Sequence, residues 1–470
     1  MTQQKRAIAV IGAGPASLYA TEVLAKQGHQ VVILNRDIKP GGLAEFGIYP
    51  TKHKMKTGLR RYFNRILQRD NVEYIGNVTV GMEADISLEE VRNLGFDATV
   101  VAVGAQGTKW LGLPGEDADA VFHAKDLVYH YNALPPFSEQ EFPIGEHVAV
   151  VGLGNVCLDI VHWMVCEKQV ESVTAIARRG PAERKFTRKE YRLVSGALDV
   201  PALQAELDRV APAMEAIGQN VEEHRKALKR FVDKPLEKES DTSFRMRFLR
   251  SPARIEVDER GQVTGIVCEK TRLVAPEVDG ERVGLERLGE FETIECDTVV
   301  FAIGDAIEPS LGLPLSPKWG DTFATVPEPW SEEPDRPRYM VYDPRREEPM
   351  WDTFVVGWAR KASDGLVGKA RADAVQGCDE IQAFLQGEFP VTPSGGRSFG
   401  EIADGLRKLL DEREVKTVDF EEVQNLTSLE QEEAQRRGVE EFKFARRDEM
   451  LRRLGKSDNN GESRFKGVDR

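Results

Sequence analysis

The chain lacks the features that would place it in a membrane or on nucleic acid. None of its apolar runs reaches the roughly 18 residues that a membrane-spanning helix needs, and its first residues lack the apolar core of a secretory signal. Acidic side chains outnumber basic ones by 78 to 64, and the net charge of −14 argues against general nucleic-acid binding. We therefore expect a cytoplasmic protein with no membrane insertion and no nucleic-acid partner.

Cysteine is also scarce, with 5 residues in 470. The five are scattered and form no CxxC pair: Cys157, Cys166, Cys268, Cys296 and Cys378. Iron–sulfur clusters and thiolate zinc sites need closely spaced cysteines, so the sequence predicts no metal site of these kinds and no disulfide framework. Any redox chemistry must then come from a bound organic cofactor.

What the chain does contain is a strand–turn–helix–strand pattern over residues 8–35. Apolar runs at 9–11 and 30–34 enclose a turn with Gly12 and Gly14 and a predicted helix from Pro15. Gly12 permits the sharp turn, and Gly14 lets backbone N–H groups approach a pyrophosphate at the helix N-terminus. The third glycine position is Ser17, and a lone motif of this kind also occurs in ordinary glycine turns. The flanking β-rich runs favour a dinucleotide-binding unit.

A second unit of the same kind follows at residues 147–167. A predicted strand leads into the turn Gly152-Leu153-Gly154-Asn155-Val156, and the small Cys157 holds the third position. Two such turns, each after an apolar strand, are much more specific than one. A chain of 470 residues is also long enough for two or three domains. The sequence therefore predicts two nucleotides, held by two domains.

The strand predicted at 173–177 ends in Arg178 and Arg179, where an NAD-specific unit would carry an acid for the ribose 2′-hydroxyl. Guanidinium groups bind phosphate through planar forks of donors. The pair favours NADP(H) over NAD(H). The alternative is that both arginines lie on a solvated surface loop and bind no coenzyme.

Positive charge is concentrated in residues 52–69 of this acidic chain. Two interpretations stay open, a solvated helix face and a docking surface for an acidic partner. The candidate docking residues are Lys52, Lys54, Lys56, Arg60, Arg61 and Arg65, and Arg69 completes the stretch.

The remaining pattern predicts how the domains divide. A strand at 96–103 closes on Gly104, the segment LPGED at 113–117 has the composition of a hinge, and a strand from 298 ends in Gly304-Asp305. The chain then returns through a strand that ends at Gly357-Trp358 and a helix from Leu366. We predict one domain from 1–112 and 306–396, a second from 113–305, and a charged helical extension at 397–470 with a disordered end.

Several longer motifs carry a family resemblance that covers most of the chain. In chain order they are VIGAGPASLYA, FGIYPTKHKMK, LPGED, VVGLGNVCLDI, ARRGPAERKFTRKEYR and GWARKASDGLVGKARADA. With these motifs the chain resembles the adrenodoxin-reductase type of ferredoxin–NADP(+) reductase. The resemblance implies an α/β fold of two Rossmann-like domains, in which the NADP(H) domain is inserted into a discontinuous FAD domain.

The resemblance also implies a flavoprotein oxidoreductase that transfers electrons between NADP(H) and a small iron–sulfur protein, ferredoxin, through FAD. It implies catalytic positions at His53, Trp358 and Gly365. The implied FAD contacts are Gly12, Gly14, Pro15, Ala16, Asn35, Gly42, Gly104, Gly357, Trp358, Gly365, Leu366, Val367 and Gly368. The implied NADP(H) contacts are Gly152, Gly154, Asn155, Val156, Arg178, Arg179 and Glu190.

The chain departs from the family pattern around the flavin. Asn35 stands where an acid usually holds the ribose, and His53 is displaced by one position in Thr51-Lys52-His53. The segment after Trp358 is also altered, to Arg360-Lys361-Ala362-Ser363. Two alternatives therefore stay open: an NADPH oxidoreductase like the small subunit of glutamate synthase, and a nucleotide-binding subunit without redox function.

Overall fold

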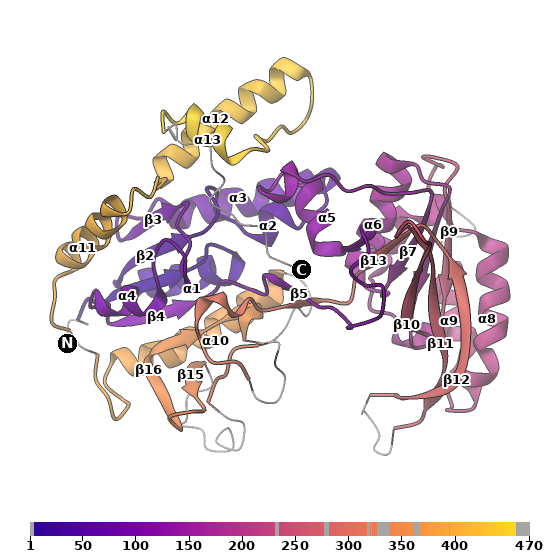
Figure 1. Ribbon diagram of the computed structural model, residues 1–470. Coiled ribbons are helices and arrows are strands. Elements are labelled where there is room, and N and C mark those ends of the chain that lie inside the picture. The colour runs from indigo at the N-terminus through magenta and orange to yellow at the C-terminus, as the bar shows by residue number, and fades with distance from the viewer. Residues whose placement is uncertain are drawn as a thin grey trace. The chain divides into compact units, whose positions relative to one another are not determined.

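The computed structural model describes residues 4–230, 235–276, 282–316, 320, 322–326, 339–360, 367–393 and 395–456 (Figure 1). These residues form two compact units. Within the described chain, one unit comprises residues 4–108, 129–139 and 304–456, and the other comprises 109–128 and 140–303. The first unit is therefore discontinuous in sequence.

The first unit is built on a six-stranded sheet in the order β15-β16-β4-β1-β2-β3. Five strands are parallel, and only β15 runs antiparallel, to β16. The strands are β1 (Ala7–Ile11), β2 (Gln30–Asn35), β3 (Val72–Gly76), β4 (Ala98–Val101), β15 (Met340–Asp343) and β16 (Glu348–Val355). The central strands are mostly apolar and almost fully buried because both faces of the sheet are covered.

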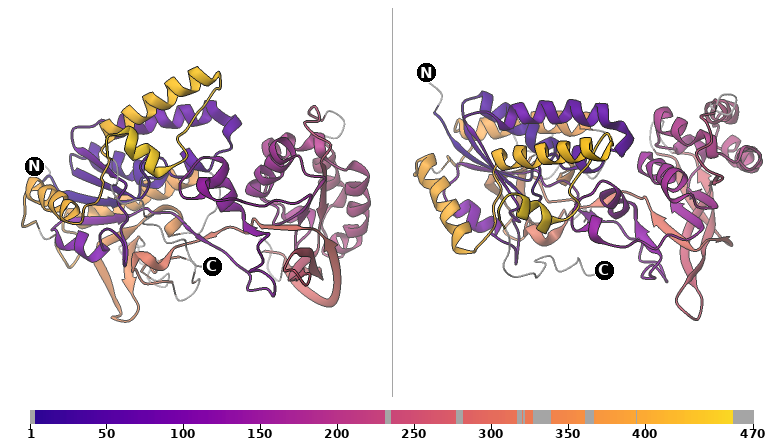
Figure 2. Two further views of the ribbon diagram at one scale, coloured as in Figure 1. Left: turned by 45° about the horizontal axis from the view of Figure 1, so that its top comes forward. Right: turned by 90° about the horizontal axis from the view of Figure 1, so that it is seen from above.

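Helices cover each face of this sheet (Figures 1 and 2). One apolar core joins the sheet to α1 (Pro15–Lys26), α3 (His53–Leu67) and α10 (Val367–Leu385). The other joins it to α4 (Leu88–Asn93) and α11 (Phe399–Glu412). The short α2 (Leu43–Phe46) also belongs to this unit, and the division between the two units falls within α5 (Ala124–Tyr131).

The C-terminal helices belong to the same unit. α12 (Phe420–Arg437) and α13 (Arg447–Arg453) add Val423, Leu426 and Met450 to the core beside α1 and α3. Just before α12, Val418 exchanges two backbone hydrogen bonds with Gly76, of 2.7 and 3.0 Å, at the edge of the sheet. The extension is thus part of the packed core as far as residue 456.

The second unit has a five-stranded parallel sheet in the order β6-β13-β7-β8-β9. Its strands are β6 (Val121–His123), β13 (Thr298–Phe301), β7 (His147–Val151), β8 (Ser172–Ile176) and β9 (Ser243–Arg247). Its helices are α6 (Asn155–Trp163), α7 (Arg188–Leu193), α8 (Val200–Glu215) and α9 (Val221–Lys229). An antiparallel sheet of β10 (Arg250–Val257), β11 (Val263–Val274) and β12 (Gly284–Glu295) continues from β9. The predicted fold class, α/β with two Rossmann-like units, is confirmed.

Candidate functional site

The first glycine turn fits tightly against the neighbouring strand. Gly12 has φ +97°, and its N–H donates to the Leu34 carbonyl at 2.7 Å. A Cβ atom at this position would lie 2.8 Å from the Ala102 carbonyl oxygen, at the end of β4. Only glycine combines this φ with so close an approach, which explains the residue at this point of the turn.

Gly14 has a different environment, because no heavy atom lies within 4 Å of the position a Cβ would take. It is the N-cap of α1 and offers no side-chain cap, so the first backbone N–H groups of the helix are free of a capping side chain. Gly42, at φ +49°, closes the space from one side, since its Cβ would lie 2.9 Å from the Gly14 Cα. An uncapped helix N-terminus beside open space suits a pyrophosphate.

Asn35 organises this turn from the end of β2. Its Oδ1 accepts from the Ala13 N–H at 3.1 Å, and its Nδ2 donates to the Asp37 carbonyl at 2.8 Å and to the Tyr74 hydroxyl at 3.0 Å. The Asn35 side chain is buried, and these hydrogen bonds occupy both the oxygen and the nitrogen of its amide group. A contact from Asn35 to a ribose stays a prediction.

The last strand of the sheet brings Gly357 to the same turn. Gly357 has φ +73°, and a Cβ there would lie 2.6 Å from the Ala16 Cβ on α1. Its N–H donates to the Asp373 carboxylate at 2.6 Å, and Arg360 pairs with the same carboxylate. The structure thus brings Gly12, Gly14, Ala16 and Gly357 together from segments more than 300 residues apart.

Trp358 follows directly and carries a buried indole N–H that has no hydrogen-bond partner among the described residues. An unpaired buried donor costs about 1–3 kcal/mol, so a bound acceptor would stabilise it. With the open space at Gly14, this donor makes the site fit a flavin nucleotide. Val367 and Gly368 open α10, Gly104 has φ +72°, and Gly365 and Leu366 lie outside the described residues.

His53 begins α3 and is held from two sides. Its Nδ1 lies 3.0 Å from the Pro50 carbonyl oxygen, and its Nε2 lies 2.5 Å from the Glu440 carboxylate, which comes from the segment between α12 and α13. A catalytic role for this histidine stays a prediction.

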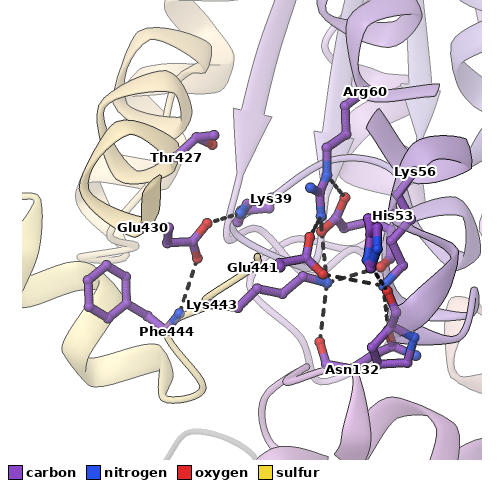
Figure 3. Close-up of polar contacts among 12 residues, drawn as sticks. Lys39, His53, Lys56, Arg60, Asn132, Thr427, Glu430, Glu441, Lys443 and Phe444 are labelled. Atoms are coloured by element: carbon purple, nitrogen blue, oxygen red, sulfur yellow. Dashed lines mark hydrogen bonds and ion pairs between the residues drawn. The ribbon is translucent and has the colours of Figure 1, made fainter. Parts of the chain in front are cut away.

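The basic helix α3 differs from the predicted docking surface at two positions. Lys56 is fully buried and donates to the Asn132 Oδ1 at 2.8 Å (Figure 3). Arg60 donates from Nε to the Glu45 carboxylate at 2.6 Å and also pairs with Glu441. The prediction that Lys56 and Arg60 present their charges to a partner is therefore wrong for this structure. Lys54, Arg61 and Arg65 are exposed.

The partners of Lys56 and Arg60 form a buried ion network with the C-terminal segment, which sequence reasoning missed (Figure 3). Lys443 lies 2.8 Å from the Glu45 carboxylate and also donates to the Asn132 carbonyl at 3.3 Å. Burial alone would raise the pKa of Glu45, but Lys443 and Arg60 outweigh it and hold that pKa well below its usual range. Burial, together with the charge of Lys443, lowers the pKa of Lys56 to about 8.

A second buried contact ties the C-terminal helices to the glycine turn. Glu430 of α12 pairs with Lys39 and accepts the Phe444 N–H at 3.1 Å (Figure 3). Lys39 stands two residues before Gly41, whose N–H donates to the Ala13 carbonyl at 2.8 Å. The C-terminal part therefore holds the loop that closes over Gly14.

The second unit repeats the glycine geometry of the first. Gly152 has φ +121°, its N–H donates to the Ile176 carbonyl at 2.8 Å, and its Cβ would lie 2.4 Å from the Ala302 carbonyl oxygen. Gly154 is an N-cap without a side-chain cap, and no heavy atom lies within 4 Å of its Cβ position. The same physical reasons fit this turn to a second dinucleotide.

The other predicted NADP(H) residues lie around this turn. Asn155 accepts the Thr187 N–H at 2.7 Å, Thr187 donates its hydroxyl to Glu190, and Val156 is exposed. Arg178 and Arg179 follow β8, and neither forms an ion pair within the described part of the chain. Burial and the nearby positive charges of Arg179 and Arg287 lower the pKa of Arg178. Positive charge without a carboxylate partner favours a bound anion.

Two uncapped glycine turns, each at the end of a parallel strand, suit a protein that binds two dinucleotides. The family model described as pyridine nucleotide-disulphide oxidoreductase matches residues 6–197. The mitochondrial NADPH:adrenodoxin oxidoreductase of Arabidopsis thaliana is 29% identical over 448 residues, which covers 88% of each chain. NADPH-ferredoxin reductase FprA of Mycobacterium leprae is 27% identical over 475 residues, covering 95% of this chain and 97% of its own.

A solved structure, Mycobacterium tuberculosis FprA in complex with NADPH, matches with a TM-score of 0.78 and 26% identity, covering 96% of this chain and 100% of that chain. These matches confirm the resemblance to the adrenodoxin-reductase type, which extends over nearly the whole chain. In the described part of the chain, every helix is too short or too polar to span a membrane.

Proposed function

We propose that this chain transfers electrons between NADP(H) and a small iron–sulfur protein of the ferredoxin type through FAD. The observation that carries the proposal is the repeated turn, in which Gly12 and Gly152 fit against a strand end while Gly14 and Gly154 face open space. The similarity to NADPH-dependent adrenodoxin and ferredoxin reductases over nearly the whole chain supports it. A cytoplasmic location stays a prediction.

When bound, FAD exchanges a hydride with the nicotinamide and single electrons with an iron–sulfur partner. The chain's own residues bind and orient. The first unit would hold FAD at Gly12, Gly14 and Gly42, and the Trp358 indole N–H would be available as a hydrogen-bond donor. The second unit would hold NADP(H) at Gly152 and Gly154, with Arg178 and Arg179 at the 2′-phosphate.

The state of the cysteines supports an electron acceptor other than a disulfide of the chain itself. All five are described and free. Burial raises the pKa of Cys157, Cys268, Cys296 and Cys378 to about 12 and that of Cys166 to about 11. Thiols with such pKa values stay protonated and are poor nucleophiles at neutral pH. The chain thus presents no reactive dithiol for disulfide exchange.

For partner docking we propose the exposed side chains Lys54, Arg61 and Arg65 of α3. Their spacing of seven and four residues places them along one side of the helix. A positive stripe on an acidic protein is complementary to an acidic electron carrier and would mainly raise the association rate.

The proposal is tested by a visible spectrum of the purified protein, followed by anaerobic addition of NADPH and then of a ferredoxin. We expect a flavin spectrum that NADPH bleaches and that ferredoxin restores. A protein that purifies with no flavin and binds none would favour the nucleotide-binding subunit. A flavin that NADPH reduces but no iron–sulfur protein reoxidises would favour the glutamate-synthase-like alternative.

Docking is tested separately by reversing Arg61 and Arg65 to Glu. The matched control reverses Arg346 and Lys408, which have side-chain exposures of 76% and 78% in the same unit. We expect ferredoxin reduction to slow only in the first variant, with reduction of a small dye unchanged. If the two variants reduce ferredoxin at the same rate, the exposed side chains of α3 form only a solvated helix face and no docking surface.

A further inference from the structure

The second unit carries a third guanidinium beside Arg178 and Arg179. Arg287 lies in β12, where it is the register partner of Thr271 on β11. The Thr271 hydroxyl donates to the Arg178 carbonyl at 2.7 Å. Side chains of directly opposed residues in an antiparallel pair point to the same face, with Cβ atoms about 5 Å apart. Arg287 therefore stands on the face of the β11–β12 hairpin that contacts Arg178.

Arg179 contacts the same hairpin. Its Nε donates to the Val283 carbonyl at 3.4 Å, one residue before β12, and its carbonyl accepts the Leu249 N–H at 3.2 Å. The backbone after β8 is thus held against β11 and the segment before β10, and the Arg179 side chain reaches the residue that precedes β12.

The local charges do not balance among the described residues. Of the three guanidiniums only Arg287 faces a carboxylate, that of Glu269, at 3.4 Å from its Nη1. The mutual repulsion is reflected in the lowered pKa of Arg178, to which burial, Arg179 and Arg287 contribute in that order. Three positive charges against one negative leave an excess of two, and a phosphate monoester carries about −1.5 to −2 charges at pH 7.

We propose that Arg287 is a third contact of the coenzyme's 2′-phosphate and contributes to the choice of NADPH over NADH; this inference rests on the proposed function. The hairpin then acts as the outer wall of the adenosine site. Arg287 supplies charge from β12, while Arg178 and Arg179 supply it from the end of β8.

The test compares Arg287→Ala with a control on the opposite face of the same hairpin. Arg272 is the register partner of Glu286, one position further along, and it pairs with that residue. The side chains of Arg287 and Arg272 are similarly exposed, at 63% and 59%. Glu269 keeps the Gly289 N–H at 3.0 Å when Arg287 is removed, so the variant leaves no bare buried carboxylate.

The measurement is calorimetric titration of the oxidised holoprotein with adenosine 2′,5′-bisphosphate and with 5′-AMP. We expect Arg287→Ala to weaken the bisphosphate about tenfold and 5′-AMP less than twofold, since one charge-assisted contact is lost. Arg287→Lys should restore part of the loss, and Arg272→Ala should change neither ligand.

Unchanged bisphosphate binding in Arg287→Ala, or an equal loss of both ligands, would overturn the inference. The variant Arg178→Ala shows whether only the role of Arg287 is wrong or whether the NADP(H) site itself is wrong. If Arg178→Ala loses the bisphosphate while Arg287→Ala keeps it, only the role of Arg287 is wrong. If the wild type does not distinguish the two ligands, the NADP(H) assignment itself fails.

Discussion

Replacing Lys56 by Met is expected to stabilise the first unit at neutral pH and to lose this effect as the pH rises. Lys56 is fully buried, and its pKa falls from 10.5 to about 8. The unfolded chain therefore binds this proton more tightly, and burying the charged side chain costs about 3 kcal/mol at pH 7. The cost falls to about 1.4 kcal/mol at pH 9.5, because the folded side chain is then neutral while most of the unfolded one is still charged.

Met keeps the length and flexibility of the lysine stem. It loses the hydrogen bond to the Asn132 Oδ1, at a cost of about 1 kcal/mol that does not depend on pH. Glu441 keeps Arg60 as its partner. The expected net gain is therefore about 2 kcal/mol at pH 7 and less than about 0.5 kcal/mol at pH 9.5.

The assay is urea unfolding of the FAD-saturated proteins at several pH values from 7 to 9.5, followed by circular dichroism. Lys54→Met serves as the control, because Lys54 is exposed on the same helix and should show no such pH dependence. A difference between Lys56→Met and wild type that is constant over this range would refute the reasoning. A variant clearly less stable at pH 7 would do the same.

Three further predictions concern the site. Gly14→Ala should fold normally, because its Cβ meets no protein atom, but it should lower FAD affinity at least tenfold. Flavin fluorescence on dilution measures this affinity, and full retention of the flavin would show that Gly14 is not part of the site. Arg178→Ala with Arg179→Ala should reduce kcat/KM for NADPH with a dye by about 10- to 150-fold and leave NADH nearly unchanged; an unaltered coenzyme preference would contradict the assignment. Glu430→Ala should destabilise the protein by about 3–5 kcal/mol in urea unfolding, because it leaves the buried Lys39 ammonium unpaired, whereas a loss below about 1 kcal/mol would show that this pair contributes little.

The glycine turns could be predicted from sequence because their cause is local. Gly12 and Gly152 need a positive φ and a close approach to a strand end, and both demands appear as a glycine after an apolar run. The position of Arg178 and Arg179 after a strand could be predicted in the same way, and their contact to a 2′-phosphate stays a prediction. The fold class follows from the two repeats of this pattern.

The surroundings of α3 could not be predicted in this way. Spaced charges on a helix indicate a solvated face, and nothing near Lys56 or Arg60 in sequence shows that they are paired. Their shared partner Glu441, and Lys443, which pairs with Glu45, come from almost 400 residues later in the chain. The position of Arg287 could not be predicted for the same reason, since only the register of β11 and β12 places it on the face that contacts Arg178.

The discontinuous first unit has a consequence for how the protein is made. The ribosome adds about 5–20 residues per second, so β1 to β4 emerge roughly 20–70 s before Glu441 and Lys443. For most of this interval β4 lacks its neighbour β16, and throughout it the charged groups of Lys56 and Arg60 have no partners from the C-terminal segment. Unpaired strand edges invite aggregation, whereas residues 140–303 of the second unit leave the ribosome as one continuous piece. Slower synthesis at low temperature lengthens this wait, so the yield of active protein should then depend more strongly on chaperones that cover the open sheet.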